Sequence, residues 1–143
     1  MDGVANGSEE RVVLIGATNR PQELDEAVIR RMPKRIYIPL PDPEGRQYLI
    51  SRLLANHGVQ LTAAECTAVV QACDGYSGSD LAALCKEAAM AGIRNLQPEQ
   101  LNSQQVPPIT KADFDAALAV IRPSVSQRSL EFYEQWNKEH GSR

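Results

Sequence analysis

The chain has 143 residues, of which 43% are hydrophobic and 23% charged, which is ordinary for a folded globular protein and excludes a disordered or collagen-like chain. Lys and Arg total 15 against 18 Asp and Glu, so the net charge is −3, which argues against a nucleic-acid module with a basic face. Because the sequence has neither an apolar run near the ~20 residues needed to span a bilayer nor an N-terminal targeting pattern, we expect no membrane span and no leader.

The first forty residues predict a strand, a short helix and a second strand. Residues 1–10 are polar and contain glycine, which indicates a loop. Residues 11–17 form a continuous apolar run, so we predict a strand covered on both faces, as in a parallel α/β sheet. A helix over residues 24–32, with Asp25 as its N-cap, separates it from a second strand over residues 35–40. This order indicates part of an α/β domain.

After Pro41 the strand pattern stops and the sequence predicts a small helical bundle. Each expected helix begins with a residue whose side chain can accept a bond from the first free backbone N–H groups. These starts are Asp42-Pro43, Thr62-x-x-Glu65, Ser77-x-x-Asp80, Thr110-x-x-Asp113 and Ser126. The Gln-, Pro- and Ser-rich residues 97–109 are expected to form a loop.

The three cysteines favour a core role over metal binding. Cys66, Cys73 and Cys85 are too far apart for a paired zinc motif, and we expect no metal site. Cys66 and Cys73 lie two helical turns apart on one apolar stripe, as small core side chains do. An odd number of cysteines fits a reduced intracellular protein better than a disulfide scaffold.

The residues that bind a triphosphate and its metal are missing from this sequence. It contains no Gly-Lys pair, and therefore no phosphate-binding loop of the form G-x-x-x-x-G-K-[ST]. The acidic pair Asp25-Glu26 follows Leu24 rather than a buried strand, so it indicates a helix start and not a magnesium-binding acid. No catalytic triad or carboxylate pair is recognisable.

Three polar features remain, and each has a structural and a functional interpretation. Asn19 lies at the carboxyl end of the first expected strand, where α/β sheets place ligands, but it is also a common turn residue. The segment 75–80 is either a glycine-rich link or a helix start whose N–H groups face a ligand. The basic cluster is either a solvated face or a functional one, and it comprises Arg30, Arg31, Lys34 and Arg35.

Taken in order, these segments resemble an AAA+ ATPase of the microtubule-severing group, the spastin and fidgetin-like proteins. The resemblance covers nearly the whole chain and is carried most specifically by ATNRP at residues 17–21 together with GYSGSDL at residues 75–81. The LDEA segment at 24–27 and the C-terminal segments 122–126 and 133–138 add to it. Met32-Pro33 and Ala91-Gly92 depart from the family pattern and bear only on the subfamily.

The resemblance implies that the chain is a C-terminal fragment with three parts. Residues 1–41 would be the C-terminal end of a P-loop α/β nucleotide-binding subdomain, and residues 42–122 an all-α four-helix lid. Residues 123–143 would be a C-terminal helix that packs on the large subdomain. The Walker A and B segments would lie upstream. The two expected strands would then lack the strand between them, so we expect this part to be the weaker one.

The resemblance also implies roles for particular residues. Asn19 matches the sensor that positions the attacking water, and Arg30 and Arg31 match arginine fingers that reach the nucleotide of a neighbouring subunit. Gly78 and Ser79 match the lid turn that lies against the adenosine. The parent protein would use ATP with Mg²⁺, form a homo-hexamer and act on tubulin in microtubules. Its expected location is the cytoplasm, on the cytoskeleton, with the nucleus as the alternative.

Two other functions stay open at this point. One is a different AAA+ disassembly ATPase, of the katanin-like or membrane-scission type, although the loop 97–109 is too short for the β insertion that the membrane-scission lid carries. The other is a non-catalytic helical module that binds AAA subunits or other partners. A phosphate loop in the coding sequence upstream of Met1 would separate these functions.

Overall fold

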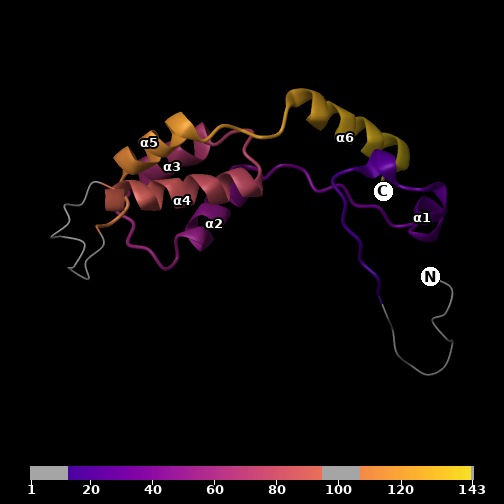
Figure 1. Cartoon of the computed structure of the whole chain (residues 1–143), viewed down its shortest axis with the longest axis horizontal. Coiled ribbons are helices and arrows are strands. Elements are labelled where there is room, and N and C mark those ends of the chain that lie inside the picture. The colour runs from indigo at the N-terminus through magenta and orange to yellow at the C-terminus, as the bar shows by residue number, and fades with distance from the viewer. Residues whose placement is uncertain (1–12, 95–106, 143) are drawn as a thin grey trace, which may run out of the picture.

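Two lobes joined by two crossing segments make up the described part of the chain, residues 13–94 and 107–142 of a computed structural model (Figure 1). The helical lobe contains α2 (Pro43–Leu53), α3 (Ala63–Ala72), α4 (Gly78–Arg94) and α5 (Lys111–Val120). The terminal lobe contains residues 13–41, with the 3₁₀ turn η1 (Pro21–Glu23) and helix α1 (Glu26–Arg31), together with α6 (Gln127–His140). Residues 13–41 and 127–142 thus lie in one lobe, and the described middle of the chain lies in the other.

Local hydrogen bonds fix the helix starts where the sequence predicts them. The Asp42 side chain accepts a bond of 2.7 Å from the N–H of Gly45, and Ser126 accepts one of 3.2 Å from Ser129. Thr62 and Glu65 form a reciprocal pair, with bonds of 3.2 Å and 2.8 Å between each side chain and the other's N–H. Each bond satisfies a backbone donor that the helix itself leaves free.

Among the residues that the structure describes, the hydrophobic core lies in the helical lobe. Helix α4 packs against α2 and α5, and α3 packs against the same two helices, so α4 is the centre of the bundle. The largest fully buried side chains of the described chain are those of Phe114, Leu81, Leu84, Val69 and Cys73. Cys85 is also buried and Cys66 lies at the edge, which confirms a core role for the cysteine stripe.

The two expected strands are not present as strands in the described residues. Residues 13–18 and 32–42 are irregular, and the side chains of Val13, Ile15 and Ile36 are 79%, 86% and 81% exposed. The prediction of a strand covered on both faces is therefore wrong for this chain, because a strand needs neighbours for its backbone groups and its faces. Within the described segments, the β pairing found is an isolated parallel bridge between Val59 and Ile109. Residues 11–12 and the loop residues 97–106 lie outside the described part.

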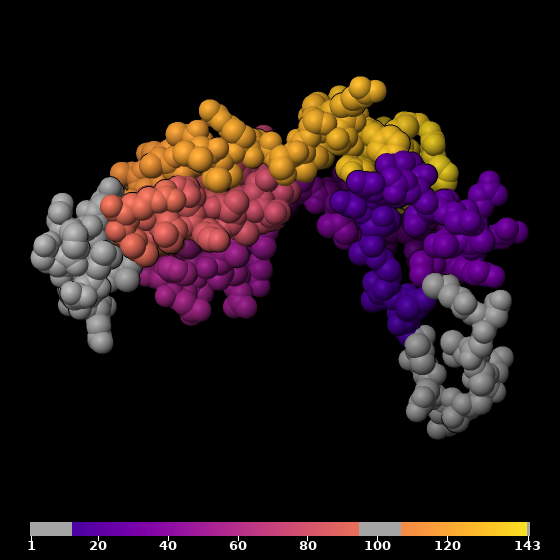
Figure 2. Space-filling view, in the orientation of Figure 1, coloured from indigo at the N-terminus to yellow at the C-terminus, as the bar shows by residue number. Residues whose placement is uncertain are grey.

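The chain crosses between the lobes twice, and side chains of the helical lobe hold both crossings. At the first, Arg46 of α2 donates a bond of 3.1 Å to the carbonyl oxygen of Pro41. At the second, the Tyr76 hydroxyl donates to the carbonyl of Ile121 over 2.7 Å, and Asp80 accepts from the N–H of Ser124 over 3.2 Å. Figure 2 shows the lobes meeting along one edge, with open space below.

Candidate functional site

Asn19 lies in a bend of the terminal lobe, just after the extended residues 13–18. Its backbone is held in place, because the Tyr133 hydroxyl of α6 donates a bond of 2.9 Å to the Asn19 carbonyl oxygen. The next N–H, that of Arg20, bonds the Thr18 hydroxyl at 2.9 Å. Asn19 itself is exposed, so its amide is available to a group outside the chain.

Arg30 and Arg31 form the last turn of α1. The helix begins at Asp25, whose carboxylate accepts a bond of 2.6 Å from the N–H of Ala27, as the sequence predicts. Both arginines are exposed. Since neighbouring helical residues are about 100° apart around the helix axis, the two side chains leave α1 in different directions.

Gly78 and Ser79 form the first turn of α4, in the helical lobe. The turn is built by Ser77 and Asp80: the Asp80 carboxylate accepts from the N–H and hydroxyl of Ser77 at 2.9 Å and 2.8 Å. Gly75, before it, has a φ of 78°, a left-handed conformation that favours glycine. A Cβ built on Gly78 would meet no atom within 4 Å, so the chain leaves open space above this turn.

Hydrogen bonds set the charge of Asp80. Burial acts to raise its pKa, but bonds from Ser77 and Ser124 outweigh burial, and the pKa lies below the ordinary value of an Asp. The ionised carboxylate therefore serves as an acceptor that joins the lid turn to the segment leading into α6. It is not directed to solvent, since Asp80 is buried.

The predicted site residues form two groups rather than one. Asn19, Arg30 and Arg31 lie in the terminal lobe, whereas Gly78 and Ser79 lie in the helical lobe. Of the bonds at the junction of the lobes, the one from the Ser124 N–H to Asp80 lies next to Gly78 and Ser79 in the chain. The sequence did not predict the contact of Tyr133 with Asn19 or that of Asp80 with Ser124. Nor did it predict that Arg35 contacts the backbone of His140. No local motif marks a contact between segments so far apart in the chain.

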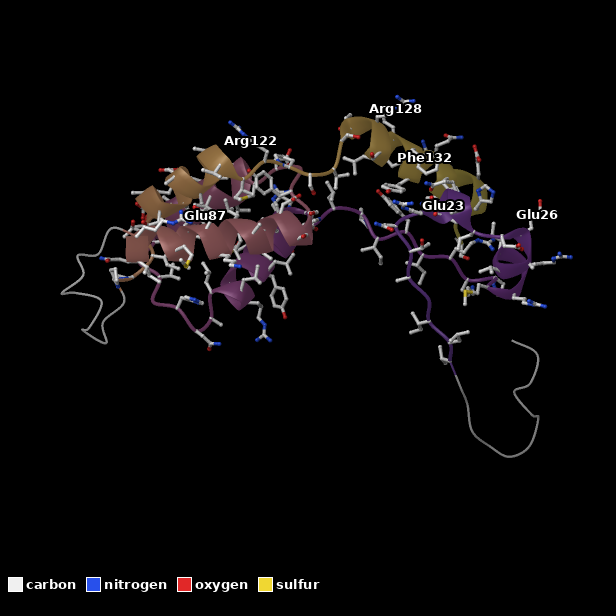
Figure 3. The ribbon with its side chains drawn as sticks, viewed as in Figure 1. Glu23, Glu26, Glu87, Arg122, Arg128 and Phe132 are labelled. Atoms are coloured by element: carbon white, nitrogen blue, oxygen red, sulfur yellow. The ribbon has the colours of Figure 1, made fainter. Side chains whose placement is uncertain are left out.

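The first turn of α4 presents a helix N-terminus to the solvent. The N-terminus of α4 carries partial positive charge beside exposed small residues, which suits a polar or anionic group. Within residues 13–94 and 107–142, no group of three or more His, Cys, Asp or Glu could hold a metal ion. Figure 3 shows Glu23 and Glu26 on the terminal lobe, well away from Glu87 on α4.

The buried Cys73 and Cys85 are not nucleophiles at neutral pH. Burial raises the pKa of the Cys73 thiol to about 11, and that of Cys85 also to about 11. At neutral pH both are therefore uncharged thiols, and only the thiolate attacks or binds metal.

No described helix is long and apolar enough to cross a bilayer.

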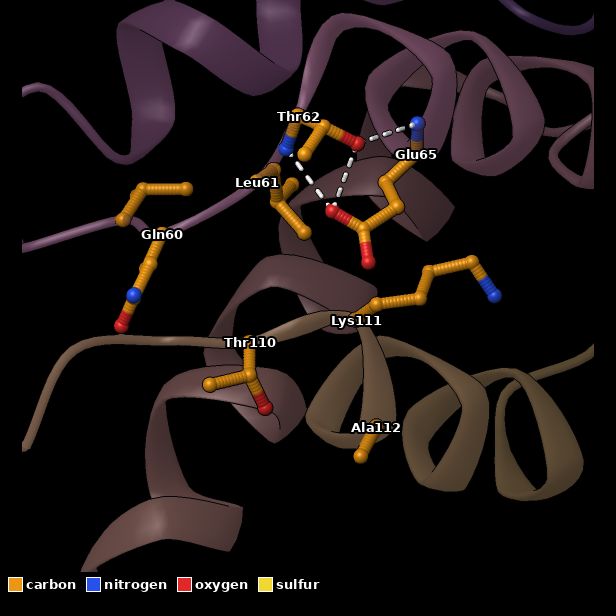
Figure 4. A pocket seen from close by; sticks show the side chains of 8 residues that line it. Gln60, Leu61, Thr62, Glu65, Thr110, Lys111 and Ala112 are labelled. Atoms are coloured by element: carbon orange, nitrogen blue, oxygen red, sulfur yellow. Dashed lines mark hydrogen bonds between the residues drawn. The ribbon is translucent and has the colours of Figure 1, made fainter.

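A separate shallow pocket of about 650 Å³ lies on the helical lobe where α3 and α5 begin (Figure 4). Its lining includes Val59, Thr62, Glu65 and Lys111, and it includes none of the predicted site residues. The Glu65 carboxylate is already engaged, since hydrogen bonds from Thr62 lower its pKa. The pocket is thus distinct from the turn at Gly78.

Comparison with known proteins identifies relatives along the whole chain. The family model for ATPases associated with various cellular activities (AAA) matches residues 1–40, and the AAA+ lid domain model matches residues 65–116. Over 144 residues, the chain is 46% identical to fidgetin-like protein 1 of Xenopus laevis and 49% identical to spastin of Nematostella vectensis. These alignments cover 99% of the chain but 22% and 24% of the two relatives, so it spans about a quarter of their length.

Solved structures agree with the sequence relatives. The crystal structure of the FIGL-1 AAA domain in complex with ADP matches 90% of this chain and 44% of that chain, with a TM-score of 0.82 and 40% identity. A structure that describes katanin self-assembly matches 82% of this chain and 44% of that one, with a TM-score of 0.70 and 29% identity. One relative thus binds a nucleotide and another self-assembles.

Proposed function

The chain belongs to the AAA family of ATPases, and we propose that it is the C-terminal part of an ATP-hydrolysing remodelling enzyme of the microtubule-severing type. In this proposal it supplies a sensor (Asn19), two arginine fingers (Arg30 and Arg31) and a lid turn (Gly78 and Ser79). The Walker A and B residues that hold ATP and Mg²⁺ come from a preceding segment. The assembly is a homo-hexamer that acts on tubulin in the cytoplasm.

The exposed end of α1 is the observation that supports this proposal most directly. Phosphoryl transfer needs positive charge where negative charge develops, and an arginine from a neighbouring subunit contributes on the order of 10³–10⁵ in rate. Arg30 and Arg31 stand exposed at the end of a short helix on the same lobe as Asn19. A guanidinium presented in this way can reach a nucleotide bound by the next subunit.

The two arginines have unequal roles in this mechanism, because they project in different directions from α1. One contacts the γ-phosphate, and the other steadies it or the interface between subunits. The planar fork of arginine suits contact with phosphate oxygens, and lysine is a poor substitute. The exposed amide of Asn19 orients the attacking water.

Mixed oligomers of the complete protein test the proposal. Subunits carrying Arg30→Ala or Arg31→Ala should still bind nucleotide but lower ATP hydrolysis in the wild-type neighbour, by up to about 10³-fold. Lys34→Ala is the matched control, because Lys34 is an exposed cation in the same segment. If both arginine variants stay within about twofold of wild type, a difference of ~0.4 kcal/mol, the finger assignment is wrong.

The 143-residue chain by itself should not hydrolyse ATP, since its sequence contains no Gly-Lys pair for a phosphate loop. Steady-state phosphate release from the purified chain is the measurement. Turnover above background that disappears when magnesium is chelated would contradict the proposal. The alternatives are a disassembly ATPase of another type and a non-catalytic interaction module; binding of AAA subunits without any change in their turnover would favour the second.

A further inference from the structure

Arg35 differs from the other basic residues of its cluster. Arg30, Arg31 and Lys34 are exposed, whereas Arg35 is half-buried. Its guanidinium donates to the carbonyl oxygen of Ile29 at 2.9 Å, to that of Met32 at 3.2 Å, and through Nε to that of His140. Arg35 is thus bound to backbone acceptors from two separate helix ends.

These acceptors are groups that need a donor. The last four carbonyl groups of a helix have no partner within the helix, and a positive charge there is also favourable. Ile29 lies in the last turn of α1, and His140 is the last residue of α6. One guanidinium therefore caps the C-terminal ends of both helices and holds them together.

The backbone of Arg35 is held by the end of the chain as well. Its N–H donates to the Ser142 hydroxyl at 3.0 Å, and its carbonyl accepts from the Ser142 N–H at 2.9 Å. The same hydroxyl donates to the Pro33 carbonyl at 3.1 Å. We call Arg35, Ser142 and these bonds the C-terminal clasp.

Helix α1 is too short to fix its own direction. It has six residues, none of them buried, and a helix this short is not stable by itself. The arginines Arg30 and Arg31 directly follow Ile29, whose carbonyl Arg35 holds. The clasp therefore helps to fix the direction in which α1 presents these two side chains.

We propose that Arg35 is a positioning residue that fixes the arginine pair of α1 against the C-terminal end of α6. The inference rests on the proposed function, in which Arg30 and Arg31 reach the nucleotide of a neighbour. Helix α6 also holds the Asn19 backbone through Tyr133. One helix, the last of the chain, thus sets the placement of both the sensor and the fingers.

Hydrogen exchange tests the clasp without any reference to ATP. In the 143-residue chain, Arg35→Ala should speed exchange of the α1 amides, read on a peptide covering residues 26–32, by about tenfold. Lys34→Ala, which removes the neighbouring exposed cation, should leave that exchange unchanged. Equal exchange in the wild type and Arg35→Ala would overturn the clasp whatever the function of the protein is.

Turnover in the complete protein tests the positioning role. In mixed oligomers, Arg35→Ala should leave nucleotide affinity within about twofold and lower hydrolysis in the neighbour by about 10- to 100-fold, because small misplacements of a catalytic group are costly. Arg35→Lys should not restore the rate, since one ammonium group lacks the fork that spans two helix ends. Full rescue by lysine would overturn the geometric argument.

A comparison of variants separates this inference from the proposed function. If Arg30→Ala or Arg31→Ala lowers hydrolysis in the neighbour and Arg35→Ala does not, the positioning role is wrong and the finger assignment stands. If none of the three arginine variants lowers hydrolysis, the proposed function and the positioning role are both wrong. Deletion of residues 140–143 should lower the rate as Arg35→Ala does, and the double variant should lower it no further, because both changes open the same clasp.

Discussion

The helical lobe and the terminal lobe are each stabilised by a different kind of interaction. In the described chain, every buried hydrophobic side chain lies in the helical lobe, between Ile50 and Ala117. The terminal lobe has none, and its helices and extended segments are joined by hydrogen bonds from Arg35, Tyr133 and Ser142. Burying one large apolar side chain contributes about 1.5–3 kcal/mol, whereas a hydrogen bond contributes a net 0.5–1.5 kcal/mol. The helical lobe therefore has a hydrophobic source of stability that the described part of the terminal lobe lacks.

Hydrogen exchange should show the largest difference between the lobes. Amides of residues 81–90 in α4 should be protected by about 10³-fold or more, since they open only with the whole bundle. Amides of residues 13–17 should exchange almost as fast as in an unfolded chain, because they have no ladder partners. Equal protection of the two segments in the isolated monomer would contradict the comparison.

Removal of one ring from the core should destabilise one lobe only. Phe114 is fully buried, so Phe114→Ala should cost about 3–5 kcal/mol, which leaves a small bundle marginal. Phe132→Ala on α6 is the matched control, since Phe132 is 41% exposed (Figure 3). Urea unfolding, followed by far-UV circular dichroism, measures both. A similar loss from the two variants would mean that the lobes share one core.

A smaller effect should appear in the acid stability of the helical lobe. The pKa of Asp80 is lower in the folded chain than the unfolded value of about 3.9. Its ionised form therefore stabilises the fold above that value, and the contribution is lost as the pH falls through the folded pKa. Asp80→Asn should lower stability at neutral pH and flatten the decline below about pH 5.

Thermal melts at several pH values measure this slope. Glu44→Gln is the control, because Glu44 is an exposed carboxylate in the first turn of α2. If Asp80→Asn and the control show the same slope as the wild type, the bonds from Ser77 and Ser124 do not stabilise the lobe.

The helix starts could be predicted from the sequence, and the strands could not, for one physical reason. A start such as Thr62 with Glu65 is complete within four residues, so its hydrogen bonds form wherever the rest of the chain lies. An apolar run such as residues 13–17 becomes a strand only beside another strand. The apolar pattern of residues 13–17 shows that they can pair as a strand, but they form one only where a neighbouring strand is present.

The same distinction applies to the candidate site. The motifs at Asn19 and Gly78 are local, and their family resemblance was visible in the sequence. The bonds of Arg35 to His140 and of Asp80 to Ser124 join residues 105 and 44 positions apart. Arg35 could not be told from Lys34 by composition or spacing, since only the folded chain turns one inward and the other outward.

The two crossings between the lobes have a mechanical consequence. Two bodies that are connected at two points can rotate relative to one another only about the line through those points. Arg46 holds the first connecting segment at Pro41. Tyr76 and Asp80 hold the second connecting segment, at Ile121 and Ser124. We therefore expect relative motion of the two lobes to follow this rotation.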